Sequence, residues 1–131
     1  MAVADFEVVL GEYDGLPDFL LISIPGFQES DEFATVAADS DLPGVIVGAA
    51  KNYLVRLEKA DGRGKLDATG RRSLDAAYGA LESMATSKDA NVQNSVVVDA
   101  LMYLNCDEPT KRRIVERLRP SSRALYDRWV A

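Results

Sequence analysis

Apolar residues recur at three- and four-residue intervals from Leu42 to Trp129, and this spacing constrains the fold more than any other feature. Such intervals place side chains on one face of an α-helix. The face is widest over residues 42–60, where Pro43 suits a first helical turn and Gly44 and Gly48 allow close contact between helices. Its apolar members are Val45, Ile46, Ala49, Ala50, Tyr53, Leu54 and Leu57.

The same spacing predicts further helices beyond this one. The polar, glycine-rich residues 61–67 read as a loop, and a helix is expected over 68–85 with Leu74, Tyr78 and Leu81 on its buried face. Residues 110–119 form an amphipathic pattern. Pro120 then opens a last helix, whose expected inward residues are Ala124, Leu125 and Trp129.

Residues 92–104 are apolar on almost every side. A helix capped by Ser87 or Asp89 is therefore expected to be the central, most buried one. The run of β-branched residues is also compatible with a strand. Helical spacing that is maintained over the whole stretch favours the helix.

The N-terminal third is harder to interpret. Residues 3–13 have a helical apolar stripe, and residues 30–38 resemble one or two helical turns. The apolar run 19–24 lies between Pro17 and Pro25-Gly26, and periodicity does not separate strand from buried helix there. A short helix is favoured because no partner strand is visible elsewhere in the chain.

The chain is therefore predicted to be all-α, a single domain over residues 1–131 that forms a compact bundle of five to seven helices. Its length fits one domain with its own core. The pattern Asp89-x-x-Val92, with Val96 and Ala100-Leu101, resembles the inner helix of a HEAT or armadillo repeat. No repeat occurs at the 40–47-residue period of such arrays, so solenoid-like packing is expected without a true array.

The residues that most enzymes need are missing. The chain has no histidine, which removes the usual acid–base side chain near neutral pH and the imidazole metal ligands. Its single cysteine, Cys106, excludes an internal disulfide and is expected to be an inert core thiol. No phosphate-binding glycine motif is present. We expect no cofactor, no metal and no enzymatic activity, although carboxylate pairs such as Asp31-Glu32 leave a histidine-free enzyme as an alternative.

The first ten residues carry two acids and no base, unlike the positive start of a signal peptide. No apolar run approaches the roughly 20 residues that a membrane helix needs. A cytoplasmic protein without a membrane partner is the expectation.

Charge divides the chain sharply. Residues 1–50 hold ten acids and no base, whereas residues 51–131 hold eleven acids and all fifteen bases. Such asymmetry indicates a charged interaction surface that attracts a basic protein, unless the two halves neutralise each other within the fold. The predicted partner-binding residues are Glu12, Asp14, Asp18, Glu29, Asp31, Glu32, Asp39 and Asp41. Aromatic residues among them, which are core residues or interface anchors, are Tyr13, Phe19, Phe27 and Phe33.

A basic cluster over residues 111–128 raises nucleic acid as a partner. The net charge of −6 argues against it, because phosphate binding needs a basic footprint.

Three segments resemble a family of small helical bacterial proteins, the immunity proteins of polymorphic-toxin and contact-dependent inhibition systems. They are Asp89–Leu104 (DANVQNSVVVDALMYL), Arg117–Trp129 (RLRPSSRALYDRW) and Ile24–Phe27 (IPGF). The family often carries an acid where Gly26 stands here. The resemblance implies an antidote that binds and blocks one cognate toxin; the alternative is a helical adaptor or scaffold without a toxin partner.

Overall fold

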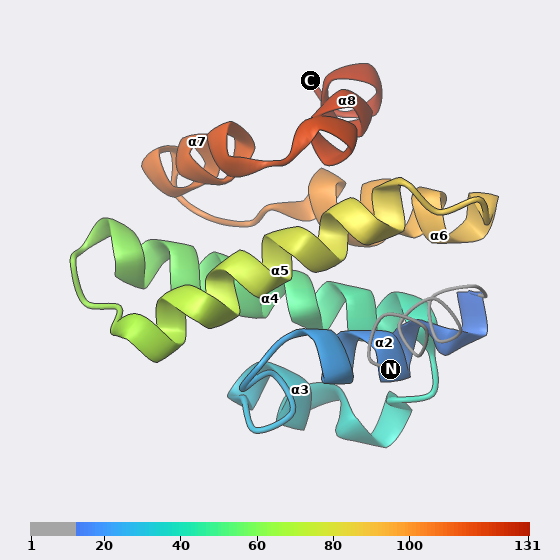
Figure 1. Cartoon of the computed structure of the whole chain (residues 1–131), viewed down its shortest axis with the longest axis horizontal. Coiled ribbons are helices and arrows are strands. Elements are labelled where there is room, and N and C mark those ends of the chain that lie inside the picture. The colour runs from blue at the N-terminus through green and yellow to red at the C-terminus, as the bar shows by residue number, and fades with distance from the viewer. Residues whose placement is uncertain (1–12) are drawn as a thin grey trace.

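Helix α4 (Pro43–Gly62) runs through the middle of the molecule and contacts elements on every side of it (Figure 1). Helix α5 (Ala68–Ala85) returns alongside α4 after a short loop. The computed structural model describes residues 13–131, and this part of the chain contains seven α-helices and no strand. The predicted all-α bundle of five to seven helices is confirmed. The helix expected over residues 3–13 lies outside the described residues, apart from Tyr13.

Two layers flank the central α4–α5 pair. On one side lie α2 (Leu16–Ser23) and α3 (Asp31–Val36), with 3₁₀ turns η1 (Tyr13–Gly15) and η2 (Ala37–Asp39). On the other side lie α7 (Glu108–Arg117) and α8 (Pro120–Trp129). The predicted short helix over 19–24 is thus confirmed, as part of α2. The HEAT-like packing stays a prediction.

Local capping explains where several helices begin. Asp67 Oδ1 accepts the Gly70 N–H at 2.7 Å and Asp107 Oδ2 accepts the Thr110 N–H at 3.1 Å. Ser30 caps α3 through a 3.1 Å bond from the Phe33 N–H, although a reciprocal capping box is absent. Each cap satisfies an N–H group that the helix cannot pair internally.

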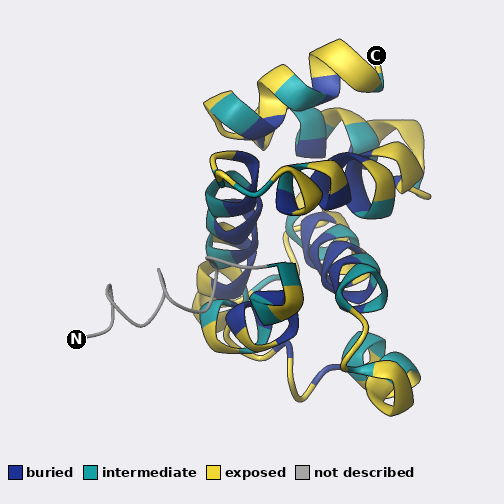
Figure 2. Cartoon of the chain, turned by 90° about the vertical axis from the view of Figure 1, so that its right-hand side faces the viewer, coloured by how far each residue is buried: buried dark blue, intermediate teal, exposed yellow. Residues whose placement is uncertain are grey.

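The core lies where α4 and α5 meet the flanking layers, as the buried faces in Figure 2 show. Each large apolar side chain buried there contributes roughly 1.5–3 kcal/mol. Fully or almost fully buried members include Leu16, Phe27, Ile46, Leu54, Met84 and Ile114.

The segment expected to be the central helix is neither regular nor the most buried. It comprises α6 (Ala90–Ser95), a π-helical turn η3 (Val96–Ala100) and a 3₁₀ turn η4 (Leu101–Tyr103). Three of its apolar side chains are 40–53% exposed, and α4 holds the central position instead. The segment packs against α4, α5 and α8, which leave part of its surface open to solvent. The exposed side chains are Val98, Met102 and Tyr103.

The expected inward face of α8 is also wrong in part. Ala124 is exposed and Trp129 is 58% exposed, whereas Ser122 and Tyr126 are buried. Helical spacing shows which residues share a face. Which face of α8 turns inward is decided by Glu82 of α5, whose carboxylate binds the start of α8.

Candidate protein-interaction surface

The predicted partner-binding acids occupy the layer of α2, α3 and the adjoining turns. Asp14 and Asp18 are exposed on η1 and α2, and Glu29 is exposed in the turn before α3. Asp31 and Glu32 begin α3, while Asp39 ends η2 and Asp41 follows it. Glu12 lies outside the described residues. We call the seven described acids the acidic layer: Asp14, Asp18, Glu29, Asp31, Glu32, Asp39 and Asp41.

Only one carboxylate of the acidic layer is neutralised by an ion pair within the part of the chain that the structure describes. Arg56 of α4 donates two hydrogen bonds to Glu32, from Nε at 2.8 Å and Nη2 at 3.1 Å. The hydrogen bond to Glu32 raises the pKa of Arg56 above its ordinary value, and Arg56 also stacks over the Tyr53 ring. The other six carboxylates are exposed, and none of them makes an ion pair with a described residue.

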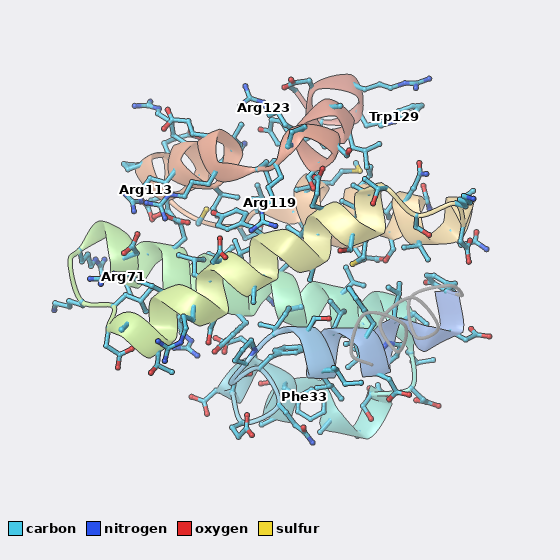
Figure 3. The ribbon with its side chains drawn as sticks, viewed as in Figure 1. Phe33, Arg71, Arg113, Arg119, Arg123 and Trp129 are labelled. Atoms are coloured by element: carbon cyan, nitrogen blue, oxygen red, sulfur yellow. The ribbon has the colours of Figure 1, made fainter. Side chains whose placement is uncertain are left out.

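The aromatic residues among these acids are mainly core. Phe19 and Phe27 are buried, and Phe27 contacts both Phe33 and Tyr53 with ring centroids 5.7 Å apart. Phe33, labelled in Figure 3, is half-buried and holds α3 to the bundle. The large apolar side chains exposed among these acids are Ile22, at 62%, and Leu42, at 49%. The sequence analysis did not identify either residue as exposed. For Ile22 the helical spacing was a signal of exposure, because Ile22 lies off the face formed by the buried positions 16, 19, 20 and 24.

The arginines of α7, α8 and their connection, on the opposite side of the bundle, mostly form ion pairs within the fold. Arg113 Nε and Nη2 lie 2.9 Å and 2.8 Å from the carboxylates of Glu58 and Asp61, and Arg117 contacts the same two acids. Arg119 pairs with Asp75 at 3.1 Å (Figure 3). These bases therefore neutralise acids of the C-terminal two-thirds rather than the acidic layer.

An open pocket of about 480 Å³ lies beside this network. Its charged lining residues are already paired, with Asp61 bound to arginines of α7 and Asp75 bound to Arg119. Tyr78, also in the lining, donates its hydroxyl to the buried Glu58. The pocket thus presents a polar wall in which the three arginines and two aspartates all make ion pairs.

The single thiol is half-buried and lies close to a backbone carbonyl. Cys106 Sγ is 3.6 Å from the Leu104 oxygen. Burial, followed by the charge of Asp107, raises the pKa of Cys106, which disfavours the nucleophilic thiolate. Among the residues with described positions, no three His, Cys, Asp or Glu side chains are grouped to hold a metal ion.

No family model, curated protein or solved structure matches the chain. Within residues 13–131, no helix combines the length and apolar composition needed to cross a bilayer.

Proposed function

We propose that this chain is a protein-binding antidote, an immunity protein that binds and blocks a cognate bacterial toxin in the cytoplasm. The proposal rests on the sequence resemblance described above and on one structural observation. Six carboxylates of the acidic layer are exposed and have no ion-pair partner among residues 13–131, while most arginines of α7, α8 and their connection pair with other acids. The fold therefore leaves one acidic face unneutralised.

Charge of one sign concentrated on one face speeds the encounter with an oppositely charged protein and repels nucleic acid and anionic membranes. In this proposal the toxin presents a basic surface, such as the cationic active site of a nuclease, and the acidic layer covers it. Ile22 and Leu42, exposed among the acids, supply apolar contacts at the interface.

The partner is identified by copurification from the native host followed by mass spectrometry, and the function by testing whether the chain protects cells that produce the toxin. Protection with tight binding is the expected result. If no copurified toxin is neutralised, the chain is instead a helical adaptor.

The surface is tested by charge reversal. Asp18→Lys combined with Asp31→Lys is expected to weaken toxin binding at least about tenfold at low salt, with a smaller effect at high salt. Glu116→Lys, a single charge reversal on the exposed face of α7, is the control, because Glu116 makes no ion pair with a described residue. Equal losses for the two variants, or wild-type affinity that salt does not change, would refute the electrostatic role of the acidic layer.

A further inference from the structure

The open pocket of about 480 Å³ beside Tyr78 is lined by more arginines than acids. Its charged lining residues are Arg71, Arg117 and Arg119, with Asp61 and Asp75. The arginines come from the start of α5, the end of α7 and the connection between α7 and α8. Figure 3 shows Arg119 in the space between α5 and the α7–α8 layer. The tertiary structure thus brings three guanidinium groups from separate segments to one open surface.

The acids beside these arginines are too few to neutralise them. Asp61 and the buried Glu58 together face three guanidinium groups, those of Arg71, Arg113 and Arg117. Even when both carboxyl groups are ionised, one positive charge remains in excess. That charge lies where the pocket opens, because Arg71 and Arg117 both line it.

Most N–H donors of the lining arginines have no acceptor among the described residues. Each guanidinium group has five such donors. Arg71 Nε lies 3.8 Å and Arg117 Nη1 lies 3.1 Å from an oxygen of Asp61, but neither arginine makes a hydrogen bond with a described residue. Arg119 donates only through Nη2, to Asp75. The remaining donors are available to the oxygen atoms of a ligand in the pocket.

Gly79 in the middle of α5 makes room for the Arg119 guanidinium. Glycine destabilises a helix interior, so its presence there calls for a packing reason. A Cβ at this position would lie 3.1 Å from Arg119 Nη1. The acid that pairs with Arg119 is Asp75, whose side chain is 81% exposed, and exposed ion pairs contribute little. Arg119 is therefore held beside the pocket by a partner that a stronger acceptor can replace.

We propose that this pocket binds a small anion that carries a phosphate group. The planar fork of a guanidinium group donates two parallel hydrogen bonds to phosphate oxygens. A phosphate offers enough oxygens for Arg71, Arg117 and Arg119 together, whereas a carboxylate has only two. The phosphate replaces Asp75 as the acceptor of Arg119. The pocket lies on the α7 side of the α4–α5 pair, opposite the acidic layer (Figure 1), so the site goes beyond the proposed function and its test needs no toxin.

Isothermal titration calorimetry at constant ionic strength tests the site. The probes are inorganic phosphate and pyrophosphate, and acetate is the carboxylate control. Saturable binding of both phosphate probes to a single site is expected, with acetate at least about tenfold weaker.

Two matched pairs of variants locate the binding. Arg71→Gln and Arg119→Gln are each expected to weaken phosphate binding at least about tenfold, whereas Arg112→Gln, the same charge change on the exposed face of α7, leaves it unchanged. Asp75→Asn is expected to act in the opposite direction and tighten binding, because it removes the competing acceptor. Asp18→Asn, on α2, is its control. All five variants alter exposed side chains, and urea unfolding without ligand checks that each is folded.

Three results would overturn the proposal. One is the absence of saturable binding with both phosphate probes. Another is acetate binding as tight as phosphate binding, which would show that the pocket recognises negative charge alone. The last is an equal effect of the pocket variants and their controls, which would place the anion elsewhere on the surface.

Discussion

The Tyr78 hydroxyl donates a 2.6 Å hydrogen bond to the carboxylate of Glu58, a side chain with no exposed surface. Arg113 completes the arrangement from α7, with its Nε 2.9 Å from the other Glu58 oxygen. A buried carboxylate is tolerated because it is hydrogen-bonded and paired with charge. Helices α4, α5 and α7 are therefore joined through one buried carboxyl group.

Replacing Glu58 with Ala is expected to lower the free energy of unfolding by about 3 kcal/mol. The substitution leaves the Tyr78 hydroxyl without its acceptor and removes one of the two carboxylates that pair with Arg113, whose Nη2 keeps its bond to Asp61. Breaking a buried pair by removing one partner is strongly destabilising. The value is at the low end of that range because Arg113 reaches solvent. Urea unfolding followed by circular dichroism measures it. Glu116→Ala, on the exposed face of α7, should stay within about 0.5 kcal/mol of wild type; comparable losses in the two variants would contradict the role of Glu58.

Tyr78 gives the protein a sensitivity to alkaline pH. Burial, then the hydrogen bond to Glu58 and the charge of that carboxylate, raises the pKa of Tyr78. A raised folded-state pKa means that the neutral phenol contributes stability that is complete below the unfolded pKa of about 10 and is lost as pH rises above it. Tyr78→Phe should therefore be about 1–2 kcal/mol less stable than wild type at neutral pH, with a gap that narrows above pH ~10. Urea midpoints measured across this range test it, and a gap that does not change with pH would contradict it.

Glu82 of α5 caps a helix that is distant in sequence. Its oxygens accept the N–H groups of Ser121 and Ser122, each at 2.9 Å, at the start of α8, where Arg119 provides no side-chain cap. Desolvation alone would raise the pKa of Glu82, but the donors from Ser122 and Ser121 outweigh it and lower this pKa.

Glu82→Gln should therefore lower the free energy of unfolding by about 1 kcal/mol at neutral pH, because it removes the negative charge at the N-terminus of α8. A carboxyl group whose pKa is lower in the folded state stabilises the fold at pH values above its unfolded-state pKa of about 4.3. This stabilisation is lost as the pH falls through the folded-state pKa. The difference between wild type and variant should thus vanish in acid, as urea unfolding from neutral pH to about pH 3 would show. A difference that persists in acid would assign the effect to packing. Glu116→Gln is the control.

The helices could be predicted because their signals are local. Pro43, Asp67 and Pro120 mark helix starts in the sequence itself, and the helix expected over 68–85 has those bounds in the structure. The exposure of Trp129 could not be predicted, because the inward face of α8 depends on Glu82 and on packing across the bundle.

The candidate surface was only partly predictable for the same reason. The absence of bases from residues 1–50 showed that any neutralising partner must come from a distant segment. Which acid would be paired depended on tertiary structure: Arg56 of α4 makes its ion pair with Glu32, whereas Asp18 makes none with a described residue. The exposure of Val98, Met102 and Tyr103 was missed because an apolar helix was taken to be a buried one.

The turn after α2 requires glycine for two separable reasons. Gly26 has φ of +81°, and the Phe27 N–H bonds to the Ile24 carbonyl across the turn, with Pro25 at the position before the glycine. A Cβ at residue 26 would also lie 2.8 Å from the Tyr53 hydroxyl oxygen. Gly64 shares the positive φ, at +68°, but has no atom within 4 Å of such a Cβ.

Gly64→Ala should therefore lower the free energy of unfolding by about 1 kcal/mol through the backbone conformation alone, whereas Gly26→Ala should lower it by about 2 kcal/mol or more. The excess arises because the added methyl group displaces the Tyr53 hydroxyl from the Pro25 carbonyl, to which it donates at 3.3 Å. Tyr53→Phe removes the clashing oxygen. In that background the loss of unfolding free energy caused by Gly26→Ala should therefore fall to that caused by Gly64→Ala. Urea unfolding of the four variants forms a double-mutant cycle with Gly64→Ala as reference, and purely additive losses at residues 26 and 53 would show that the tyrosine does not constrain the turn.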